Sequence, residues 1–295
     1  MKTIFTDQDP YICFIRANKN KKFYLQPWEG NSGDMLIWHG TENLLKDMGM
    51  QVTYSVQDAD IILIAGGNQT MWQVNIDVWK RVATRFPDKR LVIGPCTVKD
   101  GYTDWRDMVQ DVSCIEAIFA RDPESYRILS EGKISSSITT GLSHDPAFYL
   151  YGSELIQSKR EHVMEEHVLI SFRKDFEAAS SFGAFSGEEA ERSSFWGKRA
   201  YLGRKLRRKN NIKHAKSLHS EAETFLLKDV ARSVLPCFIE NVHEAKCIHT
   251  DRLHCMILAS LLSKPVMAYP TNYGKLEEVY RHSMKDWADV TFIDP

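Results

Sequence analysis

The chain of 295 residues is longer than the commonest single domain, so we expect two domains of about 130 to 150 residues each, with one large domain as the alternative. Hydrophobic residues make up 43% of the sequence and charged residues 26%, a balance that excludes disorder for most of the chain. The formal net charge of -1 excludes an overall electrostatic attraction to nucleic acid.

The six cysteines show neither a CxxC pair nor the dense spacing of a small secreted scaffold, which predicts reduced thiols. No run approaches the roughly 20 consecutive apolar residues that cross a bilayer, and the N-terminus lacks the apolar core of a signal peptide. We therefore expect a cytoplasmic protein.

The first half of the chain alternates strand-like apolar runs with helical patterns. In chain order, the predicted elements are a strand at 12–15, a helix at 35–48, strands at 52–56 and 61–65, a helix at 72–86, strands at 90–94 and 115–120, a helix at 123–130 and a strand at 137–141. Repeated strand and helix units predict an α/β fold with a mostly parallel sheet and helices on both faces.

The apolar rhythm lapses at 154–166, which predicts a linker and a domain boundary. We expect an N-terminal domain at 1–155 and a C-terminal domain at 160–275 that carries an insertion at 178–216. The predicted elements after the linker are a strand at 167–172, a helix at 221–233, a strand at 247–249, a helix at 253–262, a strand at 265–269 and a segment at 276–295 that forms a helix returning toward the N-terminal domain.

Ligands of open α/β sheets bind beyond the carboxyl ends of the strands, so the residues after each predicted strand are the candidates for function. The segment 31–34 could bind an anion at the start of a helix, or Ser32 or Asp34 could simply cap that helix. Gly66 and Gly67 allow a ligand to approach the backbone, or they make a structural turn. Both interpretations stay open for each segment.

Two segments of the second half carry charged side chains directly after a predicted strand. Arg173 suits the recognition of phosphate or carboxylate, and a surface salt bridge to a carboxylate such as Asp175 is the alternative. In the turn 250–254, Arg252 could hold an anion while His254 moves a proton near neutral pH. A structural role at a helix start is the alternative for His254.

Other types of site lack their sequence signatures. His249 and His254 lie close in sequence, but no HExxH, CxxC pair or carboxylate cluster completes a metal shell. A GxSxG nucleophile elbow and a P-loop are also absent. Asp104, Asp107 and Asp111 recur at helical spacing, which favours a solvated helix face. The sequence therefore predicts no metal site.

Eight segments, taken together and in order, resemble the polysaccharide pyruvyl transferase family and cover most of the chain outside the insertion. The turn at 250–254, followed by an apolar helix, is the most specific of them. The segments are GNSGDMLI, IAGGNQTMW, FPDKRLVIGPCT, ARDPES, HDPAF, SFRKDFE, TDRLHCMILASLLSKPV and NYGK.

The resemblance implies a GT-B-like fold, in which two Rossmann-like domains face each other across a cleft. It implies a transferase that moves the pyruvyl group of phosphoenolpyruvate onto a sugar of a polysaccharide or of a lipid-linked oligosaccharide precursor. The product is a cyclic pyruvate ketal, phosphate is released, and no metal or redox cofactor is needed.

The resemblance also implies roles for individual residues. Arg173 and Arg252 would bind the phosphate and carboxylate of phosphoenolpyruvate, and His254 would be the general acid or base. A donor with about three negative charges suits converging guanidinium groups. Further substrate-binding candidates are Asp175, Asn31, Asp34, Gly66, Gly67, Asn68, Arg121 and Lys275.

The chain departs from the family where Pro-Gln is commonly followed by Thr or Ser, because it has Cys96 between Pro95 and Thr97. This puts a polar contact to the acceptor sugar in doubt. Two other functions also stay open: a GT-B-type glycosyltransferase that uses a sugar nucleotide, and a non-catalytic protein of glycan assembly.

Basic residues crowd the segment 198–216 within the insertion. They could contact an anionic membrane surface at the inner face of the membrane, or a lipid diphosphate, and a solvated loop is the alternative. Nucleic acid is not expected as a partner, because no aromatic stacking platform accompanies these cations.

Overall fold

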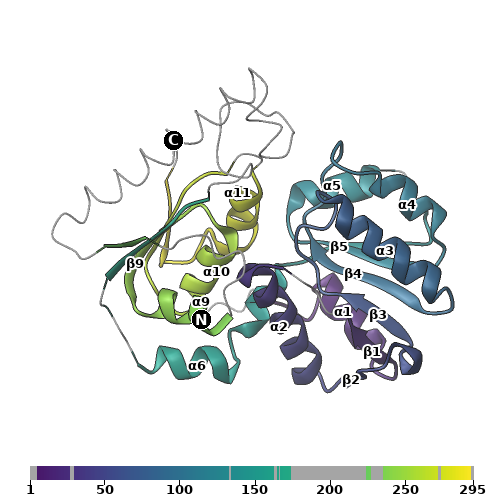
Figure 1. The fold of residues 1–295 in the computed structure, drawn as a ribbon, viewed down its shortest axis with the longest axis horizontal. Coiled ribbons are helices and arrows are strands. Elements are labelled where there is room, and N and C mark those ends of the chain that lie inside the picture. Colours follow the sequence, from purple (N-terminus) through teal and green to yellow (C-terminus); the bar gives the residue numbers. More distant parts are fainter. Residues whose placement is uncertain are drawn as a thin grey trace. The chain divides into compact units, whose positions relative to one another are not determined.

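The computed structural model describes residues 5–26, 30–132, 134–162, 165, 167–173, 224–226, 235–271 and 274–293. They form two compact units (Figure 1). The first contains the described residues of 1–29 and 34–150, and the second contains 30–33 and those of 151–295. The predicted boundary lay at 155–160, a few residues beyond this division.

The first unit contains a six-stranded parallel sheet with the strand order β2, β1, β3, β4, β5, β6. All four residues of β3 are buried, as expected for a strand of a parallel sheet that is covered on both faces. The strands are β1 Lys22–Leu25, β2 Gln51–Val52, β3 Ile61–Ile64, β4 Arg90–Cys96, β5 Ile115–Ala120 and β6 Thr139–Leu142.

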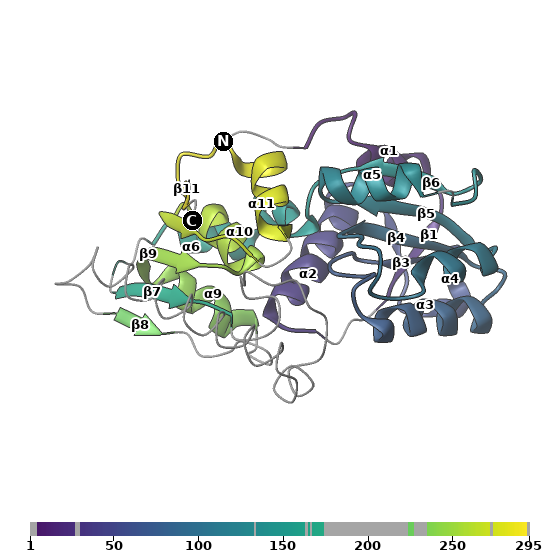
Figure 2. The same ribbon diagram turned by 90° about the horizontal axis from the view of Figure 1, so that it is seen from above.

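Helices cover both faces of this sheet (Figure 2). Side chains of α1 and α2 pack with Phe23 and Leu63 on one face, and side chains of α3, α4 and α5 pack with Ile62 and Ile64 on the other. The helices are α1 Pro10–Ala17, α2 Ser32–Asp47, α3 Gln73–Arg85, α4 Trp105–Asp111 and α5 Pro123–Glu131, with 3-10 turns η1 Val56–Asp58 and η2 Pro146–Leu150.

The second unit contains a five-stranded parallel sheet with the order β11, β10, β9, β7, β8. Helix α10 is buried nearly all round, because eight of its nine residues contribute to the core. The elements are α6 Glu154–Arg160, β7 His167–Ser171, β8 Thr224–Leu226, α9 Leu235–His243, β9 Ala245–Thr250, α10 Leu253–Leu261, β10 Val266–Ala268, α11 Lys275–Val279, the π-helical turn η3 Tyr280–Met284 and β11 Val290–Phe292.

The fold class predicted from the sequence, α/β with two Rossmann-like domains, is confirmed. Most predicted strands and helices lie within a few residues of observed ones. The predicted segment 276–295 is helical only as far as Met284, and it ends as β11 at the edge of the second sheet.

The prediction of a strand at 12–15 is wrong, because these residues lie in α1. Asp9 accepts hydrogen bonds from the backbone N–H groups of Tyr11 and Ile12, and Pro10 occupies the first turn, so both N-terminal helix signals are present. The first strand is instead β1, which the sequence pattern did not indicate.

Three further predictions need correction. Of the strand predicted at 52–56, only Val52 is in β2, and the turn η1 follows it. The predicted linker contains helix α6. Within the helix predicted at 221–233, the described residues 224–226 form β8. The insertion at 178–216, with its basic segment, lies outside the described residues.

Candidate functional site

Each sheet has a switch point, where two adjacent central strands send their connections in opposite directions. In the first unit these strands are β1 and β3, because β2 lies beyond β1 and β4 lies beyond β3. Asn31 and Asp34 follow β1, and Gly66, Gly67 and Asn68 follow β3. The carboxyl ends of strands at a switch point are where open α/β sheets bind ligands.

In the second unit the switch point lies between β7 and β9. Arg173 follows β7, whereas Arg252 and His254 follow β9. The register of the two strands places Ser171 opposite Thr250, so both loops leave the same edge of the sheet at the same level. The topology therefore brings the loops that carry these three residues to one edge of the sheet.

Short polar side chains fix the two loops to each other. The backbone N–H of Arg173 donates to Asp251 Oδ1 at 2.7 Å, and Thr250 Oγ1 donates to the carbonyl of Ser171 at 2.8 Å. Thr250 Oγ1 also accepts from the backbone N–H of Arg252 at 3.0 Å. Thr250 and Asp251 thus position the arginines, a role that the sequence analysis did not assign to them.

The imidazole of His254 lies against the backbone of Gly33, which belongs to the second unit. A Cβ atom at Gly33 would lie 2.3 Å from His254 Nδ1 and 2.9 Å from Asn31 Oδ1. Asn31 Oδ1 accepts a hydrogen bond from the backbone N–H of Gly33 at 2.8 Å. Glycine is therefore needed for the close approach of this segment to His254, and the side chain of Asn31 lies beside the same glycine.

Gly66 and Gly67 adopt φ angles of 125° and 96°, in the region that favours glycine. A Cβ atom at Gly66 would lie 2.3 Å from the carbonyl oxygen of Pro95, and one at Gly67 would lie 3.7 Å from Asp34 Oδ1. The carbonyl of Asn68 accepts from Asn75 Nδ2 at 3.0 Å. The structure thus brings Asp34 beside the glycine turn.

Arg121 lies in a buried polar network. Its side chain is fully buried, and Nη1 is 2.6 Å from Asp145 Oδ2 in an ion pair. Arg121 Nε donates to Thr97 Oγ1 at 3.0 Å, and Thr97 Oγ1 donates to Asp122 Oδ2 at 3.0 Å. This network joins the ends of β4, β5 and β6, so it stabilises the sheet edge. A role of Arg121 in binding a substrate anion stays a prediction.

Of the other predicted residues, Lys275 is the first residue of α11 and is 7% exposed, whereas Asp175 lies outside the described residues.

Burial raises the pKa of the Cys255 thiol to about 11 and that of Cys96 to about 12. Both thiols are therefore protonated at neutral pH and are poor nucleophiles.

The described residues contain no cluster of three or more His, Cys, Asp or Glu side chains that could hold a metal ion. Within the same part of the chain, every helix is too short or too polar to cross a membrane. The loops that follow β7 and β9 carry two guanidinium groups, those of Arg173 and Arg252, and the imidazole of His254.

A sequence model of the polysaccharide pyruvyl transferase family matches residues 31–273, a range that includes all four loops described above. No curated protein sequence matches the chain. A crystal structure of a functionally uncharacterized protein from Klebsiella pneumoniae is similar, with a TM-score of 0.63, 20% sequence identity and complete coverage of both chains. At this identity the similarity shows the fold alone.

Two further solved structures are similar at lower scores. UDP-GlcNAc 2-epimerase from Neisseria meningitidis, bound to UDP-GlcNAc, has a TM-score of 0.40 and 12% identity over 84% of this chain and 81% of its own. The Anabaena protein HepE, in complex with UDP and glucose, has a TM-score of 0.41 and 11% identity over 93% of this chain and 86% of its own. Scores this low support no conclusion about the present chain.

Proposed function

The chain belongs to the polysaccharide pyruvyl transferase family, and from this premise we propose that it transfers the pyruvyl group of phosphoenolpyruvate to two hydroxyls of a saccharide, forming a cyclic ketal. The observation that supports this most is the position of Arg173, Arg252 and His254, which follow the two strands at the switch point of the second sheet. A site for a small anion beside an acid or base is what this donor requires.

In the proposed site, the guanidinium groups of Arg173 and Arg252 bind the phosphate and carboxylate of the donor. Arginine suits both groups, because its planar fork donates two parallel hydrogen bonds to a carboxylate or a phosphate. The hydrogen bond from the backbone N–H of Arg173 to Asp251 supports this assignment. It ties the backbone of Arg173, after β7, to the residue that precedes Arg252 in the loop after β9.

The proposed chemistry needs proton transfer and two additions. A proton added to the methylene carbon of phosphoenolpyruvate makes a methyl group and leaves the adjacent carbon electrophilic. One sugar hydroxyl adds to that carbon and loses its proton. A second hydroxyl then adds as the bond from that carbon to the phosphate oxygen breaks, and its proton leaves with the released phosphate or to solvent. His254 is the proposed group that moves protons in these steps.

We propose that no metal or redox cofactor takes part, because every step is a proton transfer, an addition or the loss of phosphate. The acceptor is proposed to be a saccharide, and Asn31, Asp34, Gly66, Gly67 and Asn68 remain the candidates for contacts on the acceptor side. Cys96 lies where the family commonly has glutamine, so the contact to the acceptor sugar is proposed to differ in this chain.

The test is an incubation of the protein with phosphoenolpyruvate and a panel of galactose, glucose and mannosamine glycosides. Phosphate release is measured together with the appearance of the ketal methyl group by NMR, with and without a chelator. We expect both signals to appear with at least one acceptor and to persist with the chelator. His254→Ala should lower the rate by on the order of 10²–10⁴-fold, the usual contribution of a general acid or base.

The matched control is His39→Ala, because His39 is partly exposed on α2, where it lies beside Glu42 and Trp38. This variant should keep the wild-type rate. Release of phosphate without a ketal product, or a His254→Ala rate equal to that of the control, would contradict the proposal.

A further inference from the structure

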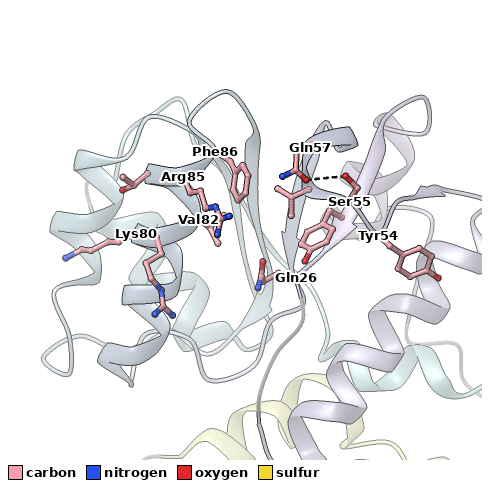
Figure 3. Close-up of a pocket in the computed structure, with 12 residues that line it drawn as sticks. Gln26, Tyr54, Ser55, Gln57, Lys80, Val82, Arg85 and Phe86 are labelled. Atoms are coloured by element: carbon pink, nitrogen blue, oxygen red, sulfur yellow. Dashed lines mark hydrogen bonds between the residues drawn. The ribbon is translucent and has the colours of Figure 1, made fainter.

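A groove lies on the first unit, at one side of its sheet (Figure 3). Its volume is about 890 Å³, within the range of about 300–1,000 Å³ typical of ligand sites. Helix α3 forms one wall, and the segment 54–57, which includes most of η1, forms the other. None of the residues assigned above to the proposed transferase site lines it.

The groove exists because the connection from β2 to β3 contains no helix. These strands lie on either side of β1, so the chain between them crosses β1, and it does so through the 3-10 turn η1. Parallel strands are usually joined by a full helix, which would cover the sheet face. Tyr24 of β1, Val56 and Phe86 therefore remain partly exposed at the margin of the core and make an apolar floor.

The wall formed by α3 is cationic. Lys80, Arg81 and Arg85 line the groove, and no carboxylate does. Lys80 is held by Asp104 at 2.9 Å, and this hydrogen bond raises the pKa of Lys80. Among the described residues, Arg81 forms no ion pair. Arg85 forms none either, and its Cζ atom lies 5.5 Å from the centre of the Phe86 ring, in a cation–π contact. Like charges one helical turn apart repel each other weakly, and an anion bound between Arg81 and Arg85 would relieve this repulsion.

The opposite wall offers an aromatic ring and neutral hydrogen-bonding groups. Tyr54 is 91% exposed, so its ring is open to solvent. Ser55 and Gln57 follow it and hydrogen-bond to each other at 3.2 Å, and the side chain of Gln26 lies between the walls (Figure 3). Aromatic faces, amides and hydroxyls together suit the apolar faces and hydroxyls of sugar rings.

We propose that this groove binds an acidic saccharide chain, with Arg81 and Arg85 on its carboxylates and Tyr54 and Phe86 against its sugar rings. The cations select an anion, and the neutral amides and hydroxyls of the other wall favour a saccharide over a ligand recognised by charge alone. The choice of a saccharide also rests on the proposed function.

Direct binding tests this proposal without depending on catalysis. A fluorescently labelled oligogalacturonate is titrated with the 295-residue protein, alongside a neutral galactan oligomer and a single-stranded oligothymidylate of the same length. We expect the oligogalacturonate to bind most tightly and its affinity to fall with salt. Tyr54→Ala, and separately the pair Arg81→Ala and Arg85→Ala, should weaken it about 5- to 10-fold or more, as expected for the loss of a stacking ring or of charge contacts.

Tyr126→Ala and Lys46→Ala are the matched controls, because both side chains are exposed and lie outside the groove. They should bind as the wild type does. Equal affinity of the groove variants and the controls would overturn the proposal, and so would tighter binding of the oligothymidylate or equal binding of the neutral galactan. Because these outcomes do not involve phosphoenolpyruvate, a protein that fails as a pyruvyl transferase could still bind the oligogalacturonate, and the reverse also holds.

Discussion

At the scale of single residues, Gly33 decides whether His254 can occupy its position. Alanine favours a helix over glycine by about 1 kcal/mol. Gly33→Ala in the first turn of α2 would therefore stabilise the protein if there were space for the new methyl group. The structure leaves no such space, because the new Cβ atom would lie 2.3 Å from His254 Nδ1. Gly33 belongs to the segment 31–34, for which the sequence left anion binding or helix capping open, but the sequence did not indicate the contact with His254, since a glycine near a helix start has several ordinary explanations.

We therefore predict that Gly33→Ala lowers the free energy of unfolding. If His254 is the proposed proton carrier, the variant should also slow phosphate release by on the order of 10²-fold, the effect of moving a catalytic group by about 1 Å. Denaturant unfolding and the rate assay measure the two effects. Gly152→Ala is the control, because a Cβ atom at Gly152 meets nothing within 4 Å. A Gly33→Ala protein that is more stable and equally active would show that His254 does not need this contact.

The buried ion pair of Arg121 and Asp145 gives a prediction about stability. Asp145→Ala leaves the guanidinium buried without its carboxylate, and removing one partner of such a pair costs about 3–5 kcal/mol. The double variant Arg121→Met and Asp145→Leu should recover most of that loss, because apolar side chains fill the same space. Urea unfolding of the single and double variants measures the difference.

Arg127→Met serves as the control for this prediction, because Arg127 forms ion pairs at an exposed helix surface, where they contribute little. It should unfold at the wild-type urea concentration. If Asp145→Ala were no less stable than this control, the buried network would not hold the ends of β4, β5 and β6 together.

At the scale of elements, the sequence predicted strands and helices best where the pattern had one explanation. The apolar run that became β3 ends at a glycine pair, and a buried parallel strand explains both features. The run at 12–15 allowed a strand or a helix, and the cap signal of Asp9 and Pro10 decided for the helix. Strand β1 was missed because its four residues follow a lysine-rich stretch and pack only in the context of the whole sheet.

Helix α1 depends on Asp9 for its start and for its connection to the rest of the unit. Asp9 Oδ1 accepts from the N–H groups of Tyr11 and Ile12, and the hydroxyl of Ser143 donates to both carboxylate oxygens at 2.9 and 2.8 Å. Asp9→Ala should lower the free energy of unfolding by about 2 kcal/mol, the upper end for a helix cap, because the side chain is buried. Asp7→Ala, at an exposed ion pair with Arg16, is the control and should change stability little.

At the scale of the whole molecule, the rule that ligands bind at the carboxyl ends of parallel strands located the candidate loops from the sequence. Arg173, Arg252 and His254 each follow a strand that could be recognised as such, so they could be found without a structure. The burial of Arg121 could not be predicted from the sequence, because it depends on Asp145, and helix α5 and strand β6 separate these two residues along the chain. The groove on the first unit could not be predicted either. It forms where the chain from β2 to β3 crosses β1 without an α-helix.

The last prediction concerns which ligand stabilises the protein as a whole. A ligand present at about 100 times its dissociation constant stabilises the folded state by about 2.7 kcal/mol, so phosphoenolpyruvate should raise the melting temperature in a phosphate-free buffer. UDP should not raise the melting temperature, because the proposed site recognises a small trianion.

Arg252→Lys should reduce the shift of the melting temperature that phosphoenolpyruvate causes, since lysine keeps the charge but loses the planar fork of donors. Arg281→Lys, on η3, should keep the full shift because its side chain is 65% exposed and pairs with Glu278. Stabilisation by UDP with no effect of phosphoenolpyruvate would instead favour a transferase that uses a sugar nucleotide, and it would contradict the donor proposed for Arg173 and Arg252.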